Sequence, residues 1–111
     1  MTHINDLVKM VHENAVAHGW WETLHLPDKL VMLHAEVSEA VEAFREQDTH
    51  TLADILYDER GKPIGFATEL ADTVIRAMDI AGQLGIDLDL VISTKHAYNI
   101  TRPYRHGNKR L

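Results

Sequence analysis

The strongest constraint on the fold is a pair of apolar stripes, one in residues 30–44 and one in residues 66–84. At about 100° per residue, the apolar side chains of each segment fall on one side of a helix, which predicts a buried face. The first stripe consists of Leu30, Leu33, Val37, Ala40, Val41 and Phe44. The second consists of Phe66, Ala67, Leu70, Val74, Ala77, Met78, Ala81 and Leu84. We expect the two stripes to pack together as the centre of a helical core.

Two acids border each stripe: Glu36 and Glu39 the first, Glu69 and Asp72 the second. Residues three apart on a helix have Cβ atoms about 5–6 Å apart. The two carboxylates of a pair are therefore able to bind one hard cation together, or each to hold one of two neighbouring cations. In a chain with 17 acids among 111 residues, such pairs also arise by chance, and most belong to solvated helix surface. Their position beside two apolar seams favours a shared metal site instead.

The rest of the chain also has a helical pattern, so the predicted class is all-α with four main helices. Residues 1–111 form a single domain, and residues 103–111 are predicted to be a flexible basic tail. Residues 48–65 lack helical periodicity and predict a loop, with Ile55-Leu56-Tyr57 able to begin a small hairpin. The expected helices are 4–18, one from about Pro27 to Gln47, 66–84 ended by Gly85, and one from Leu88 to about Ile100 capped by Asp87.

Composition removes several classes of function. The chain has no cysteine, so disulfides and thiolate metal sites are excluded, and its eight histidines form no HExxH motif. No basic-then-apolar leader and no membrane-length apolar run is present, which favours a soluble cytoplasmic protein without a membrane partner. Residues 1–94 carry 6 basic and 17 acidic side chains, a net charge of −11, which argues against a nucleic-acid partner.

The basic charge is concentrated at the C-terminal end, where residues 95–111 carry five basic side chains and no acid. On the fourth helix, Lys95, Asn99 and Arg102 share a sector with apolar Leu88 and Val91. We expect this sector to face the interior, where a buried ammonium needs an anion such as the acidic cluster or a bound phosphate. The alternative is that Lys95 extends to the surface and pairs with an acid there.

Two adjacent tryptophans, Trp20 and Trp21, follow the first helix. Because they cannot both face one side, we expect one to lie in the core and the other to be exposed or to line a pocket. An aromatic plate of this kind suits a stacked nucleobase, whereas simple packing is the alternative.

The order of these motifs resembles the MazG-like all-α nucleoside triphosphate pyrophosphohydrolases. The likeness covers most of the chain, including the Gly-Trp region after the first helix. Its pieces are ExxE at Glu36 and Glu39, Gly-Lys-Pro-Ile-Gly-Phe at 61–66, ExxD at Glu69 and Asp72, and the string from Lys95 through Tyr98, Asn99 and Arg102 to Lys109.

The resemblance implies Mg²⁺-dependent hydrolysis of a nucleoside triphosphate, usually a deoxynucleotide, to the monophosphate and pyrophosphate, with Mn²⁺ as a possible substitute. It implies attack of a metal-activated water at the α-phosphorus, a role in nucleotide-pool sanitation, and a bundle completed by a homodimer or homotetramer. Ala35 stands where members commonly have a glutamate, which leaves the number of metal ions and the general base open.

The site residues implied by the resemblance form three groups. Glu36, Glu39, Glu69 and Asp72 would bind metal, with Glu39 the first choice of general base and Lys95 stabilising developing charge. Lys95, Asn99 and Arg102 would contact phosphates, with Tyr98 beside them. Trp21 and Lys29, together with Trp20 and Phe66, are candidates for the base pocket. Two alternatives remain: a phosphoribosyl-nucleotide pyrophosphohydrolase, and a non-catalytic helical oligomer that serves as a regulator or binding module.

Overall fold

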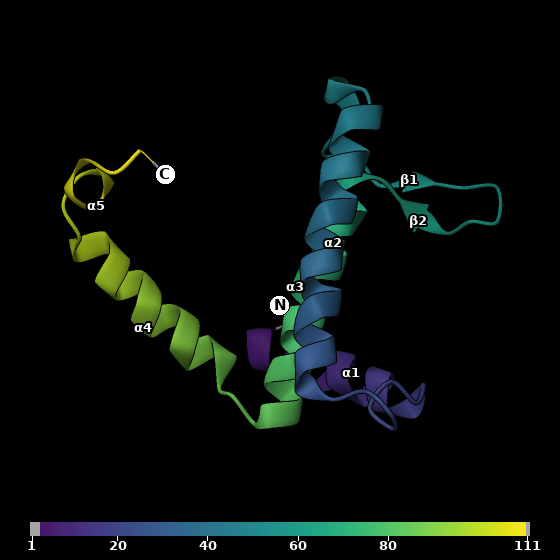
Figure 1. Cartoon of the computed structure of the whole chain (residues 1–111), viewed down its shortest axis with the longest axis horizontal. Helices are drawn as coiled ribbons and strands as arrows, with labels where there is room; N and C mark the ends of the chain where they lie inside the picture. The colour runs from purple at the N-terminus through teal and green to yellow at the C-terminus, as the bar shows by residue number, and fades with distance from the viewer. Residues whose placement is uncertain (1–2, 111) are drawn as a thin grey trace.

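The computed structural model describes residues 3–110 and is mainly helical (Figure 1). Between the second and third long helices lie a short 3₁₀ turn, η1 (Thr49–Thr51), and an antiparallel hairpin of β1 (Leu56–Tyr57) and β2 (Pro63–Ile64). The all-α prediction and the small hairpin are therefore confirmed. The helices are α1 (Ile4–Ala17), α2 (Leu26–Glu46), α3 (Phe66–Leu84), α4 (Leu88–Thr101) and the single turn α5 (Arg105–Asn108).

Local signals in the sequence set the helix ends. At the start of α2, the Asp28 carboxylate accepts a hydrogen bond of 3.1 Å from the backbone N–H of His25, and Pro27 occupies the first turn. At the start of α3, Gly65 has φ +103°, a conformation that side chains rarely adopt. The Gln47 side chain then accepts a bond of 2.8 Å from the N–H of Phe66, which joins the end of α2 to the start of α3.

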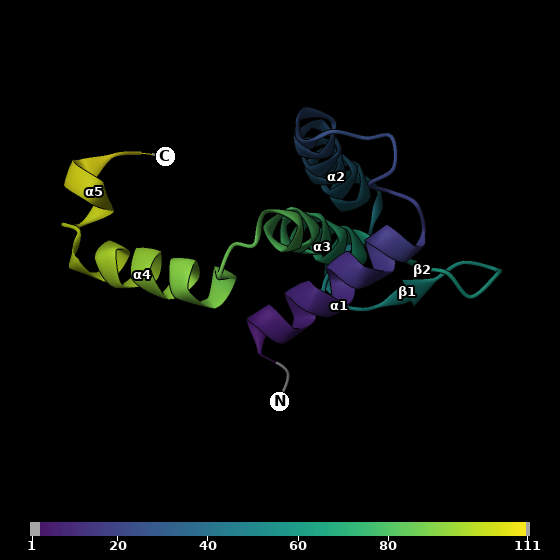
Figure 2. The same cartoon turned by 90° about the horizontal axis from the view of Figure 1, so that it is seen from below.

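The α3 helix is the centre of the fold, with α1 and α2 packed on different sides of it (Figures 1 and 2). Its contact with α1 contains the buried core residues Val8, Met78 and Ala81. Gly82 allows this close approach, because a Cβ there would lie 2.5 Å from the Cβ of His12. The small core thus lies between α1 and α3.

The expectation that the two apolar stripes bury one another holds only in part for the single chain, where Ala40 is buried and Phe44 packs on Phe66. The α2 helix turns Glu36 and Ala40 toward α3 as buried residues. Periodicity identifies a face that avoids water but does not identify what covers it, and here the described elements cover only part of it. Large apolar side chains that remain 45–53% exposed are Leu30, Val37, Val41 and Phe44 on α2, and Leu70, Val74 and Leu84 on α3.

The α4 helix leads away from the other helices (Figures 1 and 2). It is joined to α1 at its start, where the Asn5 side chain donates to Asp87 at 2.8 Å and accepts from the backbone N–H of Asp89 at 3.1 Å. From residue 90 to residue 101 every side chain is exposed. Residues 103–110 of the predicted tail are exposed as well and include α5, whereas residue 111 lies outside the described residues. Within residues 3–110, no helix combines the length and apolar character needed to cross a bilayer.

Candidate metal centre and adjoining cavity

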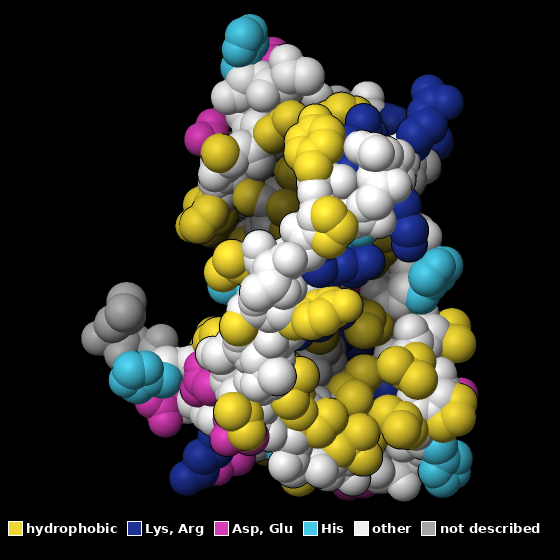
Figure 3. Space-filling model, turned by 90° about the vertical axis from the view of Figure 1, so that its left-hand side faces the viewer, with side chains coloured by type: hydrophobic (Ala, Val, Ile, Leu, Met, Phe, Trp, Pro, Cys, Tyr) yellow, Lys and Arg dark blue, Asp and Glu magenta, His cyan; other side chains and the backbone are white. Residues whose placement is uncertain are grey.

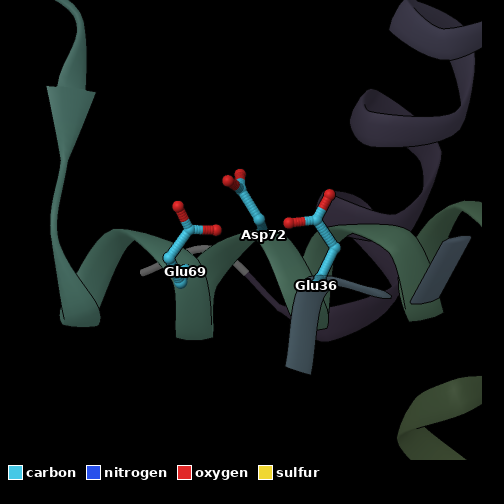
Figure 4. Close-up of side chains that lie close together, drawn as sticks. All are labelled: Glu36, Glu69 and Asp72. Carbon is cyan, nitrogen blue, oxygen red and sulfur yellow. The ribbon is translucent and has the colours of Figure 1, made fainter. Parts of the chain in front are cut away.

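Three of the four predicted acids meet between α2 and α3. Each of Glu36, Glu69 and Asp72 offers one carboxylate oxygen, and these oxygens lie within 4.8 Å of one another. Figure 4 shows Glu36 reaching across from α2 and the carboxylates of Glu69 and Asp72 rising from α3 beside it. The helical spacing places Glu69 and Asp72 on one face, and the packing of α2 on α3 brings Glu36 to them.

Two carboxylate oxygens in this cluster are buried without a hydrogen-bond partner among the described residues: Oε2 of Glu36 and Oε2 of Glu69. Glu36 is only 8% exposed, and its other oxygen accepts a bond of 2.7 Å from the Nε of Arg76. An unpaired buried acceptor costs about 1–3 kcal/mol, and more when it is charged. A bound cation would supply the missing partner for both oxygens.

The pKa values of the cluster reflect burial of its carboxyl groups and repulsion between their negative charges. Burial raises the pKa of Glu69, and the negative charges of Glu39 and Asp72 raise it further. Burial and the charge of Glu36 raise the pKa of Asp72. Burial would also raise the pKa of Glu36, but the hydrogen bond and positive charge of Arg76, together with the close approach of the neighbouring carboxyls, outweigh it and lower the pKa.

Glu39, the fourth predicted acid, lies outside this group of three. It is exposed on α2, one turn after Glu36. The close approach of the Glu36 carboxylate and its negative charge raise the pKa of the Glu39 carboxyl. Its predicted role as a metal ligand stays a prediction, whereas its position beside the cluster, open to water, suits a proton acceptor.

The donor set fits a hard divalent cation. All three converging groups are carboxylates, which are the oxygen ligands that Mg²⁺ and Mn²⁺ prefer. No histidine or thiolate belongs to the described group, so nothing in it selects zinc or copper. The side chains thus have the right chemistry for the Mg²⁺ that the sequence predicts.

A cavity of about 460 Å³ adjoins the cluster. Glu36, Asp72 and Arg76 line one part of it, which means that a ligand in the cavity has access to the carboxylates. The rest of the wall combines apolar and charged groups. These are mainly Leu7, Met10, Val11 and Ile75, with Trp20, Lys29 and Asp79. A cavity with apolar walls and a few placed polar groups is typical of small-molecule sites.

The predicted base-pocket residues separate around this cavity. Trp20 is 54% exposed and lines it, whereas Trp21 is half-buried and donates a bond of 2.9 Å from Nε1 to Asp79. Trp20 therefore lies at the cavity, as expected of one tryptophan, whereas Trp21 is half-buried rather than a core residue and is not part of the cavity lining. The ammonium of Lys29, a cavity residue, lies 4.5 Å from the Trp21 ring centroid. Phe66 packs on Phe44 at 6.0 Å and does not line the cavity.

The predicted phosphate-binding residues lie on or next to the projecting α4. Lys95, Tyr98 and Asn99 are exposed, and Arg102 is half-buried. The Tyr98 ring has the Lys95 ammonium 5.1 Å and the Arg102 guanidinium 5.7 Å from its centroid. The expectation that this face points into the interior beside the acids is wrong for the single chain, because α4 contacts α1 only near its start and then leads outward.

Two residues of the site were not predicted from the sequence. Arg76 bonds to Glu36, and buried Asp79 accepts bonds from Trp21 and, at 2.8 Å, from His12. A signal for Arg76 was present, since it follows Asp72 by four residues on the same helical face. Asp79 carries no such signal, because its partners come from residues far away in sequence.

Without metal, we expect the melting temperature to rise as the pH falls from 7 to 5. The raised pKa values of Glu39, Glu69 and Asp72 mean that the folded state takes up protons before the unfolded state does. Their stabilising contribution is therefore fully present below the ordinary carboxyl pKa and is lost as the pH rises through the folded value. Glu36, with its lowered pKa, is ionised in both states over this range.

The measurement is thermal unfolding in EDTA at pH 5, 6 and 7, for the wild type and for Glu69→Gln. The melting temperature of the variant should rise less than that of the wild type as the pH falls. Both proteins contain the same eight histidines, so a difference between them reports on the carboxylate cluster and not on histidine titration. In Mg²⁺ the trend should weaken or reverse, because the cation competes with protons for the same oxygens. Equal pH slopes for the two proteins in EDTA would contradict the proposed repulsion.

Comparison of the chain with family models, with curated proteins and with solved structures gives no match in any of the three.

Proposed function

We propose that the protein is a cytoplasmic, Mg²⁺-dependent nucleoside triphosphate pyrophosphohydrolase of the MazG-like kind, with Mn²⁺ as a possible substitute. Its products would be a nucleoside monophosphate and pyrophosphate. The observation that carries this proposal is the carboxylate cluster, in which two buried oxygens lack partners, at the edge of a cavity of nucleoside size. A cation site beside an apolar pocket suits a ligand with a charged phosphate chain and a flat base.

The roles within one chain follow from position. Glu36, Glu69 and Asp72 would hold Mg²⁺, which when bound neutralises phosphate charge and activates the attacking water. Glu39, exposed beside the cluster, would accept the proton of that water. The water oxygen bonds to the α-phosphorus, the bond from the α-phosphorus to the bridging oxygen breaks, and pyrophosphate leaves. Arg76 acts as a positioning residue through its bond to Glu36.

We further propose that a second copy of the chain completes the site. The uncovered apolar faces of α2 and α3 form a patch unusual for a lone monomer, and hydrophobic side chains also spread over the side from which α4 projects (Figure 3). The charge distribution supports the C-terminal part of a second copy as the occupant, since residues 1–94 carry −11 and residues 95–111 carry +5. The partner's α4, whose Leu90, Val91 and Ile92 are exposed, would cover this patch, and its Lys95 would reach the acidic cluster, where the ammonium would stabilise phosphate charge.

The experiment that tests the activity is pyrophosphate release from the common nucleoside triphosphates and deoxynucleoside triphosphates. We expect release with Mg²⁺ or Mn²⁺ and none in EDTA. In ¹⁸O-labelled water the label should enter the monophosphate, because the attack is at the α-phosphorus. Label in pyrophosphate would place the attack elsewhere. Release from phosphoribosyl-ATP alone would favour the related pyrophosphohydrolase, and no release from any substrate would favour a non-catalytic oligomer.

A further inference from the structure

Lys29 is the least expected group in the cavity wall. Its side chain is buried, with only 3% of the residue exposed. Among residues 3–110 the ammonium has no hydrogen-bond or ion-pair partner, and it rests on the Trp21 ring 4.5 Å from the centroid. The ring satisfies one side of the ammonium by a cation–π contact. The remaining N–H groups of the ammonium are not closed off from solvent, and Lys29 lines the cavity, so a ligand there is in a position to accept from them.

The setting of Lys29 is held in place by buried contacts. Asp79 accepts hydrogen bonds on one oxygen from the Trp21 indole at 2.9 Å and from His12 at 2.8 Å. This fixes the plane of the ring on which the ammonium rests. Asp79 is thus a positioning residue for Lys29, and the direction in which Lys29 donates is set before a ligand enters.

The cavity wall near Lys29 suits a flat heterocycle. Met10, Val11 and Ile75 give apolar contact, and the exposed Trp20 offers an aromatic face at the cavity. The same cavity reaches Glu36 and Asp72, so a nucleotide with its base beside Lys29 has its phosphates directed toward the cluster.

We propose that Lys29 donates to an exocyclic carbonyl oxygen of the base, and that the protein therefore selects nucleotides of oxo-bases over those of adenine. This rests on the proposed function for its nucleotide ligand. Guanine, cytosine, thymine, uracil and hypoxanthine each carry a carbonyl oxygen on the ring edge. Adenine carries an exocyclic amino group instead. Its N–H donors would face the N–H donors of the ammonium, which has no acceptor. Lys29 is the specificity-determining residue in this scheme.

The test measures nucleoside binding without metal or phosphates, by ¹H–¹⁵N NMR of the indole N–H groups of Trp20 and Trp21. Deoxyguanosine, deoxycytidine and thymidine should shift these signals. They should bind at least about tenfold more tightly than deoxyadenosine, which is the difference in affinity expected from one hydrogen bond to a charged donor. In Lys29→Met, which keeps the length and apolar stem of the side chain, the preference should disappear. Lys9→Met, which changes an exposed lysine outside this cavity, should keep it.

Each result decides between outcomes. Equal binding of deoxyadenosine by the wild type overturns the inference without any variant, as does a Lys29→Met protein that folds and keeps the preference. Binding of no nucleoside up to its solubility limit also overturns it. Because no hydrolysis is measured, selective nucleoside binding by a protein that releases no pyrophosphate would reject the proposed activity and leave the base preference standing.

Discussion

The Asp72→Asn variant is expected to release pyrophosphate at least about a hundredfold more slowly than the wild type, which is roughly the effect of removing a group that stabilises transition-state charge. In EDTA at pH 7 the same variant should melt at a higher temperature than the wild type. The two effects have one cause. Burial and the charge of Glu36 raise the pKa of Asp72, so its ionised form opposes folding until a cation is bound. Asparagine keeps the shape of the side chain, removes the charge and is a poor ligand for Mg²⁺.

The measurements are initial rates of pyrophosphate release and thermal unfolding with and without 5 to 10 mM Mg²⁺, roughly the range in which a weak site fills. The wild type should gain melting temperature on addition of Mg²⁺, and Asp72→Asn should gain little. Asp54→Asn, an exposed acid in the loop before the hairpin, is the matched control and should behave as the wild type. Wild-type turnover by Asp72→Asn would remove Asp72 from the site.

The sequence predicted the helices well because their ends carry local signals. The third helix was expected at 66–84 and lies at Phe66–Leu84, where Gly65 with φ +103° and Gly85 with φ +67° bound it. The meeting of Glu36 with Glu69 and Asp72 was also predicted, because helical spacing fixes the faces of the two helices. These features depend on neighbours within a few residues, which a single sequence contains.

Features that depend on the choice of partner were not predicted. Val37 and Val41 were expected inside, yet the single chain leaves both side chains exposed, because an apolar period does not say which element covers it. The bond between Trp21 and Asp79 joins residues 58 apart in sequence. No local rule links residues at such a distance, so the packing around the base pocket had to come from the structure.

Mixing two inactive variants is expected to restore activity if the partner's α4 completes the site. Asp72→Asn lacks a cluster acid, and Lys95→Ala lacks the cation on α4. In a heterodimer one site would combine an intact cluster with an intact α4 from the other chain. Random pairing of equal amounts should give about a quarter of wild-type turnover, since half of the dimers are mixed and each has one complete site.

The variants must be refolded together or co-expressed with different tags, so that subunits exchange. The mixed species, purified through both tags, should give about half of wild-type turnover, because each mixed dimer has one complete site of two. The matched control is a mixture of Asp72→Asn with Glu69→Gln, which should stay inactive because both acids come from α3 of one chain and every site in the mixture then lacks one. Recovery in that control would mean that the acids themselves are shared between chains. Failure of the first pair to recover, in mixed dimers shown to form, would mean that Lys95 acts on its own cluster or on none, and the proposed contribution of the partner's α4 would be rejected.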